Sequence, residues 1–252
     1  MSKNKIALIT GATSGIGMAT AKIFAKNNID VVLCGRREER LDALKMELEK
    51  EVAVHTLNFD VRNKTTVLEQ IESLPNNFKD IDILINNAGN AHGLEPLQDG
   101  NLEDWDAMLD INVKGLLYVS KAVIPKMTAK KAGHIINIGS TAGKEVYPNG
   151  NVYCASKHAV DAINQGMRID LNPFNIRVGA VNPGMVETEF SEVRFKGNTE
   201  KADKVYKGFT PLQPEDIADI IHFVVTRPYH VNIADLVVMS TAQASSTIVN
   251  KN

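Results

Sequence analysis

Short apolar runs alternate with segments of helical periodicity along almost the whole chain, and this alternation restricts the possible folds more than any other feature. Strands that alternate with helices form parallel sheets, and strands without polar interruptions are buried on both faces of the sheet. We therefore predict an α/β fold with a doubly wound parallel sheet. The expected strands lie at residues 5–10, 31–34, 52–57, 81–85, 135–138, 176–181 and 236–239.

The helical segments account for most of the remaining chain. They lie at residues 16–26, 38–50, 63–74, 102–130, 152–171 and 215–225. No linker or internal repeat interrupts the 252 residues, so we expect a single domain over residues 1–252. Residues 185–210 are polar and lack the periodicity of a core element, and we expect them to form a lid over a substrate.

Composition argues against several classes of function. The formal net charge of -2 gives no reason to expect binding to nucleic acid or to an anionic membrane. The two cysteines, Cys34 and Cys154, fit no disulfide framework and no metal-binding spacing. No apolar run is long enough to span a bilayer, and the N-terminus enters a strand without a signal peptide. We expect a cytoplasmic protein that binds no metal.

Ligands of doubly wound folds bind beyond the carboxyl ends of the strands, and the first such end carries a glycine-rich turn. The turn follows a strand and opens a helix, so its backbone can approach a pyrophosphate while the helix N-terminus supplies unpaired N–H groups. A plain turn could use the same glycines, but this placement favours phosphate binding. The candidate residues are Gly11, Thr13, Ser14, Gly15, Ile16 and Gly17.

The next strand ends bear on the type of dinucleotide. Arg36 and Arg37 follow the second strand, where a fold that prefers NAD usually carries an acid. Two guanidinium groups suit the 2′-phosphate of NADP, although they could also begin a solvated, charged helix. Asp60 and Val61 could face the adenine, and Asp60 could equally cap the following helix. The fourth strand ends in small residues that leave room for a ribose: Asn87, Ala88 and Gly89.

A hydroxyl, a phenol and an ammonium can converge beyond the fifth strand. Ser140 follows that strand directly, while Tyr153 and Lys157 stand four residues apart and share one face of the next helix. Such a group suits proton transfer to or from a substrate. Each residue alone is better explained as a turn hydroxyl, a core tyrosine or a solvated lysine. Their common spacing beside a phosphate loop favours catalysis.

Together these motifs resemble the classical short-chain dehydrogenase/reductase family. The resemblance rests on TGATSGIG at residues 10–17, NNAG at 86–89, Asn112, Ser140, Tyr153 with Lys157, and NPG at 182–184. Further stretches are similar to the NADP-dependent 3-hydroxy acid (serine, allo-threonine) dehydrogenases of that family. They are CGRREERL at 34–41, NGNVYCASK at 149–157 and TEFSEVRFKG at 188–197.

This resemblance implies a Rossmann-type fold, NADP as cofactor, a homotetramer and hydride transfer. It implies that Tyr153 is the general acid and base, that Lys157 lowers the Tyr153 pKa and binds ribose, and that Ser140 orients the substrate oxygen. Asn112 would support the proton relay. Additional cofactor contacts are implied for Pro183, Gly184, Val186 and Thr188.

The expected substrate is a small 3-hydroxy acid such as L-serine, L-allo-threonine or 3-hydroxypropionate. Its carboxylate needs a cation near Ser140 and Tyr153, and Arg194 in the expected lid is the candidate, because a guanidinium can bind a carboxylate through two hydrogen bonds. A solvated arginine is the alternative. Two other functions remain open: a general carbonyl or 3-oxoacyl reductase, and an NADP-binding regulator without turnover.

Overall fold

The computed structural model describes residues 4–251, and these contain one parallel sheet of seven strands. The strand order is β3-β2-β1-β4-β5-β6-β7, so the order reverses between β1 and β4. This confirms the predicted doubly wound, Rossmann-type sheet. The limits of the predicted domain at residues 1 and 252 lie outside the described residues. The strands are β1 Ile6–Thr10, β2 Asp30–Gly35, β3 Val54–Asn58, β4 Ile83–Asn86, β5 Gly133–Ile138, β6 Ile176–Pro183 and β7 Asp235–Val238.

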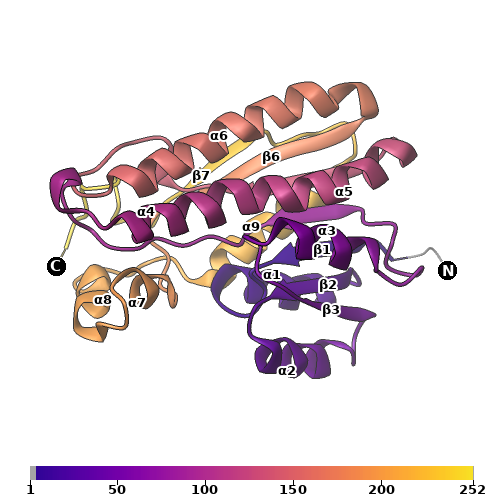
Figure 1. Cartoon of the computed structure of the whole chain (residues 1–252), viewed down its shortest axis with the longest axis horizontal. Coiled ribbons are helices and arrows are strands. Elements are labelled where there is room, and N and C mark those ends of the chain that lie inside the picture. Colours follow the sequence, from indigo (N-terminus) through magenta and orange to yellow (C-terminus); the bar gives the residue numbers. More distant parts are fainter. Residues whose placement is uncertain (1–3, 252) are drawn as a thin grey trace.

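Helices cover both faces of this sheet (Figure 1). One face carries α1 (Gly15–Lys26), α2 (Glu38–Leu48) and α9 (Pro214–Val225). The other carries α3 (Lys64–Glu72), α5 (Leu116–Lys130) and α6 (Asn151–Leu171), and α5 and α6 run side by side. None of the helices within residues 4–251 combines the length and apolar character that crossing a membrane requires.

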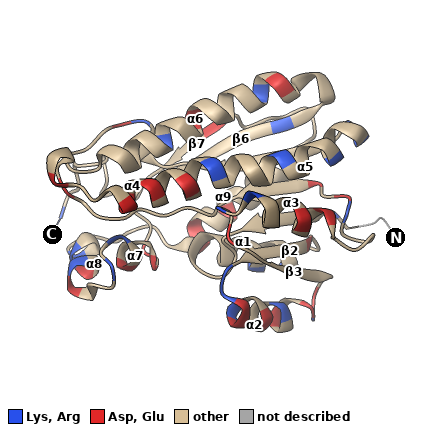
Figure 2. Cartoon of the chain, viewed as in Figure 1, with Lys and Arg blue, Asp and Glu red and all other residues tan. Residues whose placement is uncertain are grey.

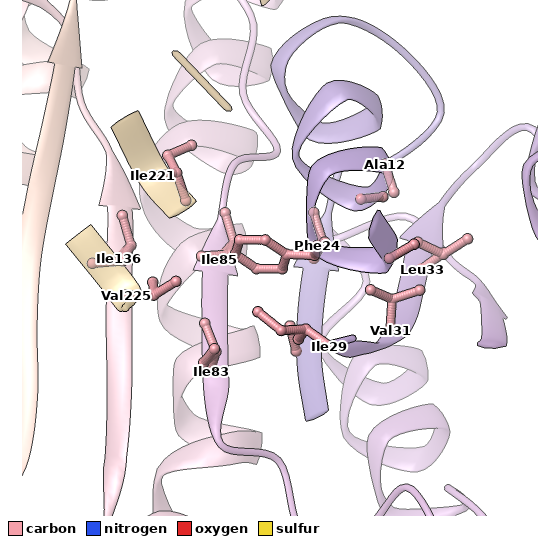
Figure 3. Close-up of a cluster of buried hydrophobic side chains, with 14 of the residues drawn as sticks. Ala12, Phe24, Ile29, Val31, Leu33, Ile83, Ile85, Ile136, Ile221 and Val225 are labelled. Atoms are coloured by element: carbon pink, nitrogen blue, oxygen red, sulfur yellow. The ribbon is translucent and has the colours of Figure 1, made fainter. Parts of the chain in front are cut away.

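The central strands are largely apolar because successive side chains enter two different cores. Ala7 and Ile9 of β1 join the cluster beneath α1, α2 and α9, whereas Ile6 and Leu8 join the cluster on the opposite face. Figure 3 shows Phe24 of α1 in the first cluster, among strand residues and side chains of α9. This packing holds α1, and therefore the turn before it, against the carboxyl end of β1.

The predicted helix over residues 102–130 contains a change of helical type. It consists of α4 (Leu102–Leu109), a π-helical segment at Asp110–Gly115, and α5. Asn112 lies in the π-helical segment, and its buried amide forms hydrogen bonds outside the helix. A π turn is common where a side chain must be directed at a site, and it is not visible in the apolar periodicity.

The expected lid at residues 185–210 contains two short helices, α7 (Phe190–Arg194) and α8 (Thr199–Tyr206). In Figure 1 they stand apart from the helices that cover the sheet. Asn198 caps α8 by accepting a hydrogen bond from the Lys201 amide. Figure 2 shows charges of both signs interspersed on α8 and on α2.

Candidate active site

A cavity of about 640 Å³ lies beyond the carboxyl ends of the central strands, where the strand order reverses. Both the place and the volume are typical of small-molecule sites in doubly wound folds. The structure brings most of the predicted site residues to its wall: Gly11, Thr13, Ser14, Gly15, Ile16, Arg36, Arg37, Asp60, Val61, Asn87, Ala88, Gly89, Ser140, Tyr153, Lys157, Pro183, Gly184, Val186, Thr188 and Arg194. Gly17 and Asn112 are the two predicted residues outside this lining.

The glycine-rich turn presents the start of α1 to the cavity. Ser14 precedes α1 and makes no side-chain capping hydrogen bond, so the first N–H groups of the helix remain available to a phosphate. Gly11 has a φ of 67°, a backbone conformation that favours glycine. A Cβ at Gly17 would collide with the Gly11 carbonyl and the Asn87 amide, so Gly17 permits the close packing of the turn rather than contact with a ligand.

Arg37 is held firmly beside this turn. Its guanidinium donates hydrogen bonds to the Thr13 and Ser14 hydroxyls and, at 2.7 Å, to the Glu189 carboxylate. Arg40, one turn further along α2, donates to the same carboxylate at 2.6 Å. Arg37 is therefore not simply the solvated start of a charged helix.

Asp60 lines the cavity, 3.6 Å from Arg36 across an ion pair. It also accepts hydrogen bonds from Arg62. Burial acts to raise the pKa of Asp60, but the arginines outweigh it and the pKa is lowered. The alternative that Asp60 caps the following helix is wrong, because Asn63 caps α3.

Ser140, Tyr153 and Lys157 meet at the same wall of the cavity. Burial raises the pKa of Tyr153, while a hydrogen bond with Ser140 acts in the opposite direction. Burial lowers the pKa of Lys157 to about 8. The Lys157 ammonium donates at 2.9 Å to the Ile138 carbonyl, at the end of β5. A buried phenol, a hydroxyl and a buried cation thus line one cavity, a combination that suits proton transfer.

Asn112 lies behind this wall. Its amide accepts from the Asn90 N–H at 2.8 Å and donates to the Asn90 carbonyl and the Ser156 hydroxyl. A Cβ at Gly89 would lie 3.1 Å from Asn112 Oδ1 and 3.6 Å from Lys157 Nζ. The Asn112 amide oxygen and the Lys157 ammonium therefore both lie close to Gly89, and a side chain at that position would have little room.

Arg194 projects from the end of α7 over the catalytic tyrosine candidate. Its guanidinium carbon lies 5.6 Å from the ring centre of Tyr153 and 5.5 Å from that of Tyr147. Its Nε donates at 3.2 Å to the Gly93 carbonyl, and the Gly93 amide donates to the Arg194 carbonyl in return. These paired hydrogen bonds fix the end of α7 against the loop after β4.

Several cavity residues were not predicted from the sequence. Tyr147 lies between Ser140 and Tyr153 in the chain, and its only signal is an aromatic side chain in that loop. Tyr206 and Gln243 reach the cavity from distant segments, and both hold the chain after β6: Tyr206 donates to the Val186 carbonyl, and Gln243 accepts from the Met185 amide. Glu189 was not singled out either.

The cavity suits a phosphorylated dinucleotide by its own chemistry. It combines an uncapped helix N-terminus, two arginines and a buried lysine ammonium. No group of His, Cys, Asp and Glu side chains in the described part of the chain is arranged to hold a metal ion.

Comparisons with known proteins agree with this chemistry. A family model described as short chain dehydrogenase matches residues 5–199. An NADP-dependent 3-hydroxy acid dehydrogenase of Salmonella typhi is 48% identical over 240 residues, which cover 95% of this chain and 96% of that protein. Sulfoacetaldehyde reductase 2 of Chromohalobacter salexigens is 47% identical over 242 residues, covering 96% of each chain.

A solved structure extends the similarity to three dimensions. The closed form of serine dehydrogenase complexed with NADP+ superposes with a TM-score of 0.92 at 45% sequence identity. The match covers 96% of this chain and 98% of the other.

Proposed function

Because the chain belongs to the short-chain dehydrogenase family, we propose that it transfers a hydride between NADP and the 3-carbon of a small 3-hydroxy acid. The observation that carries the proposal is the position of Arg194, 5.6 Å from the Tyr153 ring and in the same cavity as Ser140 and Lys157. An acid bound by this guanidinium has its hydroxyl within reach of the tyrosine. A neutral substrate would not need a cation there.

The residues that would hold NADP divide along the cavity. The N-terminus of α1 would bind the pyrophosphate, Arg36 and Arg37 would bind the 2′-phosphate, and Lys157 would bind the nicotinamide ribose. Asp60 and Val61 would contact the adenine. The small residues after β4 and β6 would leave room for the ribose and the nicotinamide, and Thr188 would bind the nicotinamide amide. NADP supplies the acceptor for the hydride that leaves the carbinol carbon.

Tyr153 would move the proton that accompanies the hydride. In oxidation it takes the proton from the substrate hydroxyl, and in reduction it returns it. Burial raises the pKa of Tyr153, and the Arg194 guanidinium acts to lower it. In the proposed reaction the Lys157 ammonium, which lines the same cavity, adds further positive charge that favours the phenolate. Ser140 orients the substrate oxygen and stabilises charge that develops on it. Asn112, next to Lys157 across Gly89, supports the relay of the proton.

A lid at residues 185–210 would close over the substrate and carry Arg194 to its carboxylate. Arg194 suits a sulfonate as well, since both anions offer several oxygens to a guanidinium. The 47% identity to a sulfoacetaldehyde reductase therefore makes reduction of a sulfonated aldehyde the second candidate. Activity as a general 3-oxoacyl reductase has less support, because the bulkier acyl chain of its substrate offers no anion that Arg194 would bind.

The test is a comparison of kcat/KM for L-serine, L-allo-threonine, 3-hydroxypropionate and 2-hydroxyethanesulfonate, each with NADP and with NAD. We expect NADP to be preferred and a carboxylate to be the best substrate. Arg194→Ala should lower kcat/KM for the acids about 10²-fold or more relative to a neutral alcohol. An unchanged ratio between acid and alcohol, or activity only on the sulfonate, would overturn the carboxylate assignment.

The assembly and location belong to the same proposal. A homotetramer is supported by the large apolar side chains Leu109 and Leu117, which stay 39% and 41% exposed on α4 and α5. A cytoplasmic location is supported by the bacterial relatives and by two free, buried cysteines, Cys34 and Cys154.

A further inference from the structure

One carboxylate joins the expected lid to the arginines beside the phosphate turn. Glu189 immediately precedes α7, and its two oxygens accept hydrogen bonds from Arg37 at 2.7 Å and from Arg40 at 2.6 Å. Glu189 is half-buried and Arg37 is exposed, and both residues line the large cavity. Each carboxylate oxygen of Glu189 thus accepts a hydrogen bond from a different guanidinium group.

The other donors of Arg37 face its own turn. Nε and Nη2 donate to the Thr13 hydroxyl, Nη2 donates also to the Ser14 hydroxyl, and Nη1 donates to Glu189. On the edge of the guanidinium that faces away from the turn, Nη1 therefore donates to Glu189. Burial acts to raise the pKa of Glu189, but the hydrogen bonds from Arg37 and Arg40 outweigh it and keep the carboxylate charged.

A carboxylate and a phosphate monoester compete for the same partners. Both present oxygens that accept paired, charge-assisted hydrogen bonds from arginine. A 2′-phosphate that reaches Arg37 must displace the Glu189 oxygen, because two anions cannot share the same edge of one guanidinium without strong repulsion.

We propose that Glu189 is a specificity-determining residue, whose carboxylate occupies the position of the cofactor 2′-phosphate on Arg37 and Arg40 and is displaced by it. This inference rests on the proposed function, since it takes NADP as the cofactor. NADH lacks the phosphate and leaves the Glu189 contacts in place.

The experiment measures binding of NADPH and of NADH by fluorescence titration to the wild type, Glu189→Gln and Glu192→Gln. Glu192 is the matched control, because it is exposed on the same helix and forms no ion pair within residues 4–251. Glutamine keeps the shape of Glu189 and removes the charge. We expect Glu189→Gln to bind NADPH about three- to tenfold more tightly, with NADH changed by less than about twofold.

Three results would overturn the inference: an NADPH affinity that stays within twofold of the Glu192→Gln control, one that falls, or an equal gain for NADH. Glu189→Asp is a second variant, which keeps the charge but is one methylene too short to bridge both arginines, and it should also bind NADPH more tightly. The wild-type titration also tests the proposed function separately. A wild-type protein without preference for NADPH over NADH contradicts the cofactor assignment itself, whereas a wild type with that preference and an unaffected Glu189→Gln contradicts only the inference.

Discussion

At the scale of single residues, the hydroxyl of Tyr153 is the group on which the proposed chemistry depends. Tyr153→Phe removes this hydroxyl and leaves the ring packed against Phe190, whose centre lies 5.6 Å away. Loss of a positioned general acid or base costs about 10²- to 10⁴-fold in rate, so we expect kcat to fall by that factor while NADPH affinity stays within about twofold. Steady-state kinetics and a binding titration check this. Retention of kcat would assign the proton transfer to another group.

Lys157 links the site to the pH dependence of stability. Its pKa falls from 10.5 to about 8 on folding. Between these values the unfolded chain binds more protons, so the free energy of unfolding rises with pH; below pH 8 the cost of the buried charge is fully present. Lys157→Met removes that cost, and the cofactor-free variant should be more stable than the wild type at pH 7, by roughly 3 kcal/mol at most.

Urea unfolding of the cofactor-free protein at pH 7, 8, 9 and 10 tests this sign. The advantage of Lys157→Met should shrink as pH rises above 8, because the wild type gains stability there. A variant that is less stable at pH 7, or an advantage that grows toward pH 10, would contradict the expected cost of the buried ammonium.

The site residues that could be predicted from the sequence are those whose partners lie nearby in the chain. Tyr153 and Lys157 stand one helical turn apart, so their meeting follows from helix geometry. Glu189 and Arg37 are separated by 152 positions, and no periodicity relates them. The arginines were predicted as a phosphate site. The Glu189 carboxylate that binds Arg37 was not predicted, because its position depends on the path of the lid segment.

At the scale of elements, the strands were easier to predict than the helix that carries Asn112. Apolar runs between turn residues mark buried strands, and the capping box of Gln213 with Asp216 begins α9 at Pro214, one residue before the predicted segment 215–225. The π-helical segment at Asp110–Gly115 was not predicted, because the extra residue displaces the apolar pattern only once, and a single displacement resembles an irregular apolar stripe. The two lid helices were missed because α7 and α8 bury few residues.

Asn112 connects this π-helical segment to the loop after β4 and to α6. Its amide is buried and holds the Asn90 backbone and the Ser156 hydroxyl. Asn112→Ala leaves the Asn90 N–H without its partner, so we expect a loss of about 1–3 kcal/mol in the free energy of unfolding. Asn27→Ala is the control, since Asn27 is exposed and bonds only within its own helix. Urea unfolding of both variants checks the difference. Equal stabilities would mean that Asn112 has no structural role.

At the scale of the whole molecule, two independent cores place all chemistry at one edge of the sheet. The central strands β1, β2, β4, β5 and β6 contribute side chains to both clusters, so their backbone ends are held from both faces. The turn after β1, the loop after β4, Ser140 after β5 and the chain after β6 consequently meet at one cavity. The sheet and its direction were predictable from the alternation alone. The way the lid packs across that cavity was not, because its contacts are polar and far apart in sequence.

The exposed apolar side chains on the outer face of α4 and α5 bear on the proposed tetramer. Leu117 stays 41% exposed, on a helix that lies beside α6 in Figure 1. A lysine at a buried interface costs far more than at a free surface, so Leu117→Lys should shift the protein from a tetramer to smaller species. Met46→Lys is the control, since Met46 is 66% exposed on α2, away from these helices. Size-exclusion chromatography with light scattering reads the mass directly. A wild type that elutes as a monomer would contradict the proposed tetramer. If the wild type is a tetramer and Leu117→Lys leaves its mass unchanged, the interface lies on another face.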